Sequence, residues 1–144
     1  MCFLAFGPLL FRAPAPVIFY VHGSLFVAGD AWTHGAFSGE VLAQLFNVLI
    51  VGAQYRLGIF GFLALQELQE EAAPTRHTGN YGLLDEQGAL KWVDDNGMAF
   101  GGSKSLLIWG GWVDGAVSIC YHLMSRASSG MFGGAIMQGT LHVE

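Results

Sequence analysis

The sequence predicts an α/β fold, built on a mostly parallel β-sheet with helices on both of its faces. Strand-like apolar runs alternate with segments of helical periodicity along the 144 residues, an order typical of parallel sheets. The composition agrees, because 53% of the residues are hydrophobic and only 12% are charged, about half the charge of an average soluble domain. So few charges indicate that much of the chain is buried on all sides, as in the interior of a larger α/β protein.

Four apolar runs predict the strands. "PVIFYVHG" (16–23) and "NVLIVGAQYRLG" (47–58) are rich in β-branched and aromatic residues, without clean alternation between apolar and polar positions. Strands that are buried on both faces have this pattern. "SLLIW" (105–109) predicts a third strand, and "AIMQGT" (135–140) predicts a fourth.

A helix is predicted between the first two strands. Residues 35–46, "GAFSGEVLAQLF", have apolar residues at helical spacing, which places Val41, Leu42 and Leu45 on one face. The most polar part of the chain, "QELQEEAAPTRHTG" (66–79), follows the second strand and is expected to be an exposed loop.

Two longer helices are expected in the second half. Residues 80–100 predict a helix that turns Leu83, Leu90 and Val93 inward and its acidic residues outward. Residues 115–125, "GAVSICYHLMS", predict the other helix, directly after the third strand.

Charge and hydropathy exclude some classes of function. The net charge is −5, and the six Lys and Arg residues form no basic cluster, so no nucleic-acid partner is expected. No apolar run reaches the roughly 20 residues of a membrane-spanning helix. The start of the chain is apolar and ends in Ala13-Pro14-Ala15, but it lacks the positive charge of a signal peptide, and prolines crowd the cleavage point. An ordinary strand and loop is therefore preferred there, and the localisation stays open.

A turn that contains glycine directly follows the first predicted strand. In "HGSLF" (22–26), backbone N–H groups can be aimed at a developing oxyanion, as in the H-G-G-G-type loop of lipases and esterases. His-Gly also occurs in ordinary strand-to-helix turns, so this loop by itself leaves both interpretations open.

The segment "WGGWVDGAVS" (109–118) joins the third predicted strand to the last predicted helix. Serine hydrolases of the α/β type carry their nucleophile at such a turn, in the pattern G-x-S-x-G. Here the five residues that end the turn are Gly111, Trp112, Val113, Asp114 and Gly115, and the pattern occurs nowhere in the chain. The glycines are present, and the serine is missing.

Together with "QYRLGIFGFL", "GNYGLLDEQGALKWVDDN", "AFGG" and "YHLMS", these strings stand in a specific order. From about residue 16 to 140 the sequence resembles the type-B carboxylesterase and cholinesterase family. The resemblance implies an α/β-hydrolase-type fold, of which residues 1–144 form a partial domain, the front portion. It also implies hydrolysis of small carboxylic esters through an acyl-serine intermediate, without a cofactor or metal. Members of the family are often secreted.

The resemblance places the oxyanion-hole loop at Gly23, Ser24 and Leu25, with Asp114 joining it from the turn before the last helix. The N–H groups of Ser24 and Leu25 would be the donors. The family prefers glycine or alanine at these two positions, because the backbone turns tightly and approaches the substrate closely. Ser24 keeps its N–H group, whereas Leu25 adds a bulky side chain where the acyl group is expected to fit.

The nucleophile position can be assigned in two ways. Alignment back from the last helix places Val113 where the family's G-E-S-A-G pattern has serine, whereas alignment forward from the preceding strand places Trp112 there. Neither residue carries a nucleophilic group. The flanks match so well that a shift of reading frame at this turn is an alternative explanation.

Other residues near or after this turn are candidates for the missing catalytic groups. Ser118 matches a family residue inside the helix, past the turn, and is not expected to act as the nucleophile. Asp114 as a carboxylate nucleophile would require a shift of the turn and the burial of an unpaired carboxylate, which is costly. Downstream, His122 matches a structural helix position, and His142 and Glu144 lie at the chain end. The family's own triad acid and histidine lie far beyond residue 144.

The remaining acidic residues favour ordinary roles. Asp85 is expected to be stabilised by the dipole at the start of its helix. The pairs Glu70–Glu71 and Asp94–Asp95 are expected on solvated faces. No cluster has the spacing of metal ligands.

Three functions stay open. A working carboxylesterase fits the resemblance, but loss of a triad member typically leaves only about 10³–10⁴-fold catalysis over water. A non-catalytic, esterase-like binding or adhesion module is the second. The preferred hypothesis is a truncated or degenerate, catalytically impaired member of the family. A partial sheet would also leave apolar faces and strand edges uncovered, which predicts self-association.

Overall fold

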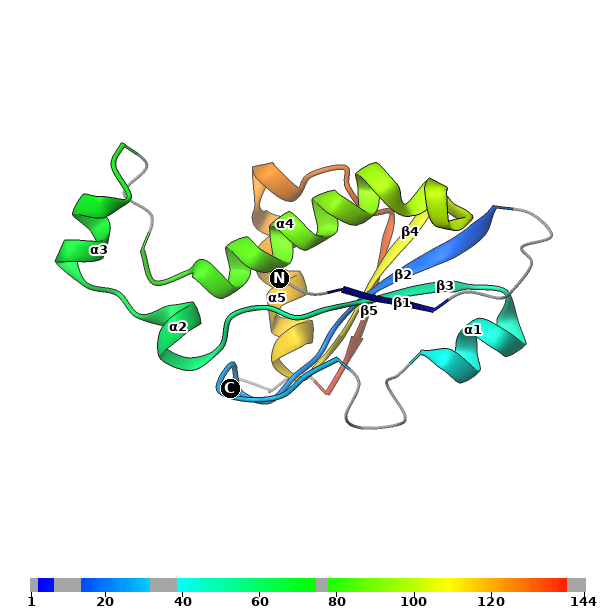
Figure 1. Cartoon of the computed structure of the whole chain (residues 1–144), viewed down its shortest axis with the longest axis horizontal. Helices are drawn as coiled ribbons and strands as arrows, with labels where there is room; N and C mark the ends of the chain where they lie inside the picture. The colour runs from blue at the N-terminus through cyan, green and yellow to red at the C-terminus, as the bar shows by residue number, and fades with distance from the viewer. Residues whose placement is uncertain (1–2, 7–13, 32–38, 75–77, 140–144) are drawn as a thin grey trace.

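The computed structural model describes residues 3–6, 14–31, 39–74 and 78–139, in which a five-stranded sheet forms the centre of the molecule (Figure 1). The order across the sheet is β1-β3-β2-β4-β5; β1 is antiparallel to β3, and the other neighbouring strands are parallel. The predicted mostly parallel α/β sheet is confirmed. The strands are β1 (Phe3–Phe6), β2 (Ala15–Val21), β3 (Leu49–Ala53), β4 (Gly102–Trp112) and β5 (Gly134–Gln138).

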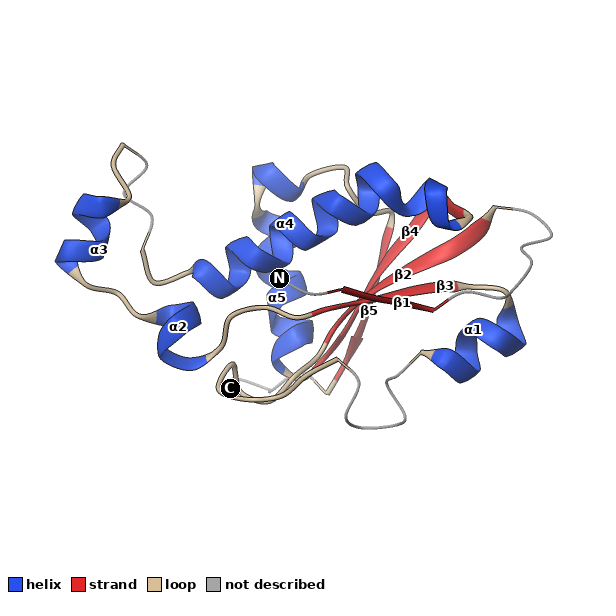
Figure 2. Ribbon diagram, viewed as in Figure 1, coloured by secondary structure: helices blue, strands red, loops and turns tan. Residues whose placement is uncertain are grey.

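Helices lie against both faces of this sheet, and Figure 2 shows α4 running along it while α3 projects away from it. Two 3₁₀ turns, η2 (Gly97–Phe100) and η3 (Arg126–Ser128), follow the two longest helices. The α-helices are α1 (Glu40–Phe46), α2 (Gly58–Phe62), α3 (Gln66–Glu71), α4 (Tyr81–Asn96) and α5 (Asp114–Met124).

The hydrophobic core lies between the sheet and the helices α4 and α5. Alternate side chains of β2 point into it, and Phe19 meets Trp109 of β4 edge to face, with 4.9 Å between the ring centroids. Leu90 of α4 and Ile119 of α5 close the core from the other side, both fully buried. Removal of this apolar surface from water is the main force that holds the two helices on the sheet.

The opposite face of the sheet is covered less completely. Ile18 and Tyr20 of β2 are half-buried there, and with Leu42 of α1 and Ile136 of β5 they line a cleft of about 280 Å³. Helices therefore lie on both faces of the sheet, as predicted, but α1 is short and contacts only part of its face.

The register of the parallel strands fixes the place of the site. Val21, the last residue of β2, pairs with Gly111 near the end of β4. The loop after β2 and the turn after β4 therefore meet at the carboxyl end of the sheet, where ligand sites of open α/β sheets are built.

The predicted helix between the first two strands is present as α1, and one prediction about the first half was wrong. The apolar side chains Val41, Leu42 and Leu45 of α1 are 62%, 45% and 69% exposed, and Ala43 is the buried residue of this helix. Residues 66–71, expected in a loop, form helix α3. Gln and Glu have good helix propensity, so a polar sequence alone does not exclude a short exposed helix.

Two predictions about α4 were also wrong. Glu86 was expected outside and is fully buried. Asp85 is the fifth residue of the helix rather than its start. Its carboxylate pairs instead with the Arg56 guanidinium, at 2.7 Å from Nε and 2.8 Å from Nη2, and accepts the Arg56 backbone N–H. Leu90 and Val93 are buried as predicted, whereas Leu83 is half-buried.

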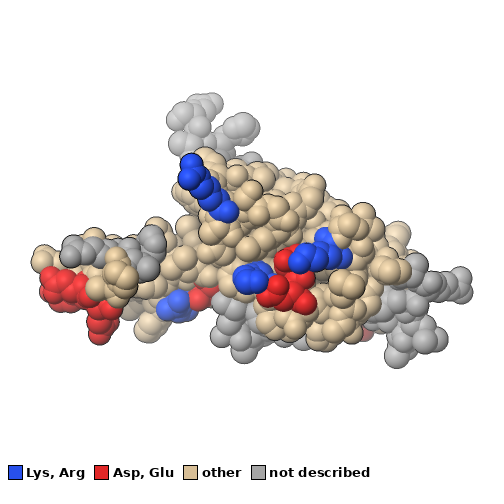
Figure 3. Space-filling view, turned by 90° about the horizontal axis from the view of Figure 1, so that it is seen from above, with Lys and Arg blue, Asp and Glu red and all other residues tan. Residues whose placement is uncertain are grey.

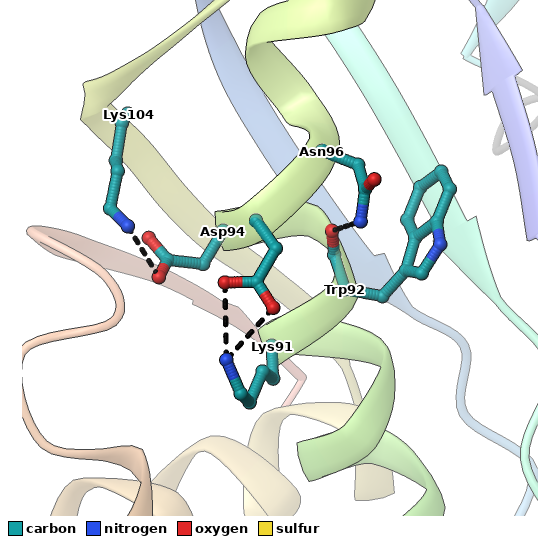
Figure 4. Close-up of polar contacts among 6 residues, drawn as sticks. Lys91, Trp92, Asp94, Asn96 and Lys104 are labelled. Atoms are coloured by element: carbon teal, nitrogen blue, oxygen red, sulfur yellow. Dashed lines mark hydrogen bonds and ion pairs between the residues drawn. The ribbon is translucent and has the colours of Figure 1, made fainter.

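Asp94 and Asp95, which were expected on a solvated face, form ion pairs with lysines. Lys104 Nζ lies 2.7 Å from Asp94 and Lys91 Nζ lies 2.8 Å from Asp95 (Figure 4). Figure 3 shows the molecule from above relative to Figure 1; on that face charged side chains gather in a few places and leave most of the surface uncharged. In the described part of the chain, no helix has the length and apolar character needed to span a bilayer.

We expect the isolated chain to self-associate through β5 and the partly covered face beside it. Ile136 and Met137 of β5 are 45% and 38% exposed, and exposed apolar strands at a sheet edge pair readily with other chains. Light scattering coupled to size exclusion across a dilution series should show a mass that rises with concentration. Ile136→Lys should lower the association, whereas Leu65→Lys, ahead of α3, should not. A single monomer mass at every concentration would contradict the prediction.

Candidate active site

The turn between β4 and α5 consists of one residue, Val113, whose backbone has φ 53° and ψ −110°. A β-branched residue at positive φ is strained by about 1–3 kcal/mol. Its N–H donates to the Gln138 carbonyl at 2.8 Å, and its own carbonyl accepts the N–H groups of Ala116 and Val117, each at 3.1 Å. Both sides of the turn therefore impose the strained conformation.

Glycines allow the strand and the helix to approach each other at this turn. A Cβ at Gly111 would collide with the Gly115 carbonyl, and a Cβ at Gly115 would collide with the Val21 carbonyl oxygen. A Cβ at Gly23 would collide with the Trp112 carbonyl oxygen. The absence of a side chain at these three glycines is therefore required by the close approach of the two segments.

Asp114, the first residue of α5, is the centre of the site and is only 2% exposed. Its Oδ1 accepts the backbone N–H groups of Ser24 at 2.7 Å and Leu25 at 2.8 Å, and its Oδ2 accepts that of Phe26 at 2.8 Å. Hydrogen bonds to an ionised group are about twice as strong as neutral ones. The carboxylate, which would be costly if unpaired, is well satisfied.

The backbone of the loop after β2 aims these donors at one point. Leu25 and Phe26 both adopt left-handed conformations, with φ 61° and 57°, and successive N–H groups in such a turn form a concave anion site. The loop is fixed by a hydrogen bond from the Val27 N–H to the Ser24 carbonyl at 3.2 Å and by one from the Gly58 N–H to the Phe26 carbonyl at 2.6 Å.

Uncharged aromatic groups line the other side of Asp114. The Tyr55 hydroxyl donates to the His22 carbonyl at 2.9 Å, and the Tyr55 hydroxyl oxygen lies 3.5 Å from Asp114 Oδ2. The rings of Tyr55 and His22 stack on each other. Burial lowers the pKa of His22 and raises that of Tyr55, which keeps both neutral near pH 7. Among the described residues, no Lys, Arg or His forms an ion pair with Asp114.

The structure brings together the residues expected in the oxyanion loop, Gly23, Ser24, Leu25 and Asp114. The Leu25 side chain is 66% exposed, and Trp112 is the half-buried last residue of β4. Sequence reasoning missed the third donor, the Phe26 N–H, and did not foresee that Asp114 accepts all three. The sequence holds no signal for these contacts, because backbone donors leave no trace in a pattern of residue types.

A second polar cluster lies in the core, away from this turn. Ser118 of α5 is fully buried and donates to Glu86 Oε1 at 3.0 Å, while His122 Nε2 lies 3.4 Å from Glu86 Oε2. The serine thus contacts a carboxyl group and not an imidazole. The arrangement is unsuited to a nucleophile, which needs exposure and an adjacent base.

The other side of His122 is also occupied. Its Nδ1 forms a 2.9 Å hydrogen bond with Ser128 Oγ, which also accepts from Gln87 Nε2 at 3.1 Å, and its ring stacks on Trp109. These contacts fit a structural histidine. His142 and Glu144 lie outside the described residues. The described ranges hold no group of three or more His, Cys, Asp or Glu side chains that could bind a metal.

The fold and the turn define an α/β-hydrolase-type protein, and the comparisons name its family. The model of the carboxylesterase family matches residues 10–143, so this chain belongs to the carboxylesterase family. It is 35% identical over 136 residues to an acetylcholinesterase of Leptinotarsa decemlineata and 38% identical over 123 residues to one of Gallus gallus. The solved structure of a PNB esterase superposes with a TM-score of 0.82 at 34% identity.

The matches cover the chain and only a part of each relative. The two acetylcholinesterases match over 94% and 85% of this chain but over 21% and 15% of their own lengths. The PNB esterase covers 96% of this chain, which spans 28% of that structure. The chain therefore spans only about a seventh to a fifth of the length of the two acetylcholinesterases.

The strain at Val113 predicts that glycine is more stabilising than alanine at this position, the reverse of their usual order in a helix. Glycine tolerates φ 53° and alanine does not, so Val113→Gly should be more stable than Val113→Ala by about 1 kcal/mol. Urea unfolding of both variants measures the difference. In the interior of α5, Val117→Gly should instead be less stable than Val117→Ala by about 1 kcal/mol. The same order at both positions would show that Val113 is not strained.

The burial of Glu86 predicts that Glu86→Gln stabilises the folded protein by an amount that depends on pH. Burial raises the pKa of Glu86 above its ordinary value, so the folded protein keeps this proton at pH values where the unfolded chain has lost it. The stability that this group contributes is complete below its unfolded pKa and is lost as the pH rises through its folded pKa. Glu86→Gln should therefore exceed the wild type in stability by more at pH 8 than at pH 5.

Urea unfolding at the two pH values tests this prediction. Gln can still accept the hydrogen bond from Ser118, so packing is largely retained. Glu67→Gln on α3, which removes the same charge from an exposed helix away from the sheet, is the control. An equal gain of Glu86→Gln at both pH values would contradict the raised pKa.

Proposed function

We propose that this chain is a carboxylesterase-family member with a degenerate catalytic turn, unable to form an acyl-serine intermediate. The observation that carries the proposal is Val113 at the strained turn between β4 and α5, with φ 53°. The geometry supports Val113 over Trp112 as the nucleophile position, because Trp112 still belongs to β4. An isopropyl group cannot attack an ester carbonyl.

The state of the oxyanion donors supports the same conclusion. An oxyanion hole works only when its N–H groups are free to bind the developing charge. Here the N–H groups of Ser24 and Leu25 are bound to Asp114 Oδ1 at 2.7 and 2.8 Å. A substrate oxygen would have to displace a carboxylate that is already in place. The turn therefore lacks both the attacking group and the vacant donors of an esterase.

A fluorophosphonate probe, which labels activated serines, tests the proposal together with hydrolysis of p-nitrophenyl acetate. We expect no covalent label on the chain and no hydrolysis above the buffer rate, alongside an intact carboxylesterase that gives both signals. The proposal would be overturned by stoichiometric labelling with turnover. In that event Ser24→Ala and Ser118→Ala would identify the serine, since one lies beside the turn and the other behind it.

A further inference from the structure

Three backbone N–H groups converge on one anionic side chain in this site. The donors come from consecutive residues, Ser24 to Phe26, and the acceptor comes from Asp114, 88 to 90 positions along the chain. The carboxylate is 2% exposed. A buried charge is tolerated only where its surroundings satisfy it, and here backbone dipoles do so in place of a cation. The loop thus has the properties of an anion-binding site.

We propose that the loop of Ser24 to Phe26 is a carboxylate-binding site and that Asp114 is its built-in occupant. The chain closes the site with its own side chain, and a small free carboxylate takes its place when the Asp114 carboxylate is removed. The inference adds a ligand class to the site of the proposed function, and rests on that proposal only for the absence of a nucleophile beside the bound group.

The geometry selects the class of ligand. Two donors bind one oxygen and the third donor binds the other, which matches the two oxygens of a planar monocarboxylate. Tyr55 and His22 close the site with neutral side chains. Burial raises the pKa of Tyr55 and lowers that of His22, so each stays in its uncharged form near pH 7. A phosphate dianion would bring a second charge and a tetrahedral shape into a buried place where no described residue offers a cation, so it is disfavoured.

Tethering explains why the site is closed in the natural chain. A side chain held beside its donors acts at a high effective concentration and pays no further cost for loss of translational freedom. The turn also holds Asp114 rigidly, since it follows Val113 directly and begins α5. A free carboxylate in solution competes poorly against such an occupant.

Rescue of the variant Asp114→Ala by acetate tests the inference. Thermal unfolding of the full chain is measured in sodium acetate and in sodium chloride at equal ionic strength and pH 7. The variant should melt at a lower temperature than the wild type in chloride. Acetate at about ten times its Kd should raise the Tm of Asp114→Ala by about 3–6 °C and leave the wild type unchanged. If the variant is unfolded in chloride, recovery of its helical circular dichroism in acetate is the readout.

Two further variants and one further anion sharpen the result. Asp94→Ala removes a carboxylate that pairs with Lys104 at the surface and should show no acetate effect. Asp114→Asn keeps a side chain in the site and should gain less from acetate than Asp114→Ala. Equal acetate shifts in Asp114→Ala and Asp94→Ala, equal gains in both Asp114 variants, or an equal gain from inorganic phosphate would each overturn the inference.

The two proposals at this site fail separately. Absence of acetate rescue would overturn the carboxylate site and leave the missing nucleophile untouched. Labelling and ester turnover by the natural chain would overturn the degenerate turn, while rescue of Asp114→Ala would still establish the carboxylate site.

Discussion

The hydrogen bonds between Asp114 and the loop of Ser24 to Phe26 are the interaction on which the site depends. They join two segments that follow different strands, β2 and β4, and that lie 88 to 90 positions apart in sequence. A carboxylate buried without partners would cost several kcal/mol, whereas three charge-assisted hydrogen bonds make it a strong link. The loop conformation and the start of α5 are therefore coupled: neither segment satisfies its buried polar groups without the other.

The sheet could be predicted because the signals for it are local. An apolar run without alternation predicts a strand wherever it occurs, and one buried on both faces in the interior of a sheet. β3 is buried along its whole length, whereas β2 alternates between buried and half-buried residues because one face of the sheet is only partly covered. Burial of helix faces is not local. The apolar residues of α1 have the spacing of a buried face, yet Leu45 is 69% exposed. The partners of the buried Glu86 lie more than 30 positions away: Ser118 donates a hydrogen bond to one of its oxygens, and His122 Nε2 lies 3.4 Å from the other.

The candidate site was predictable in outline for a similar reason. The positions of Gly23 to Leu25 follow from motif order, which records where a chain turns, whereas motif order left the apex of the second turn open between Trp112 and Val113. The direction of the Asp114 side chain does not follow from motif order either. A pattern of residue types shows no backbone donors, so a buried aspartate looks unpaired in sequence while three N–H groups hold it in the fold. Partners supplied by the main chain are invisible to such reasoning, however specific the motif.

The proposed loss of the nucleophile and the presence of Asp114 fit together physically. Backbone donors that are aimed at one buried point need an acceptor in the resting protein. In an enzyme, water or substrate supplies it, and the donors must release it in every cycle. Without an attacking group no transient oxyanion arises, so a permanent anion carries no catalytic penalty and stabilises the loop. The strain at Val113 persists for the same reason: the glycine contacts and the Asp114 bonds impose this turn whether or not its apex bears a nucleophile.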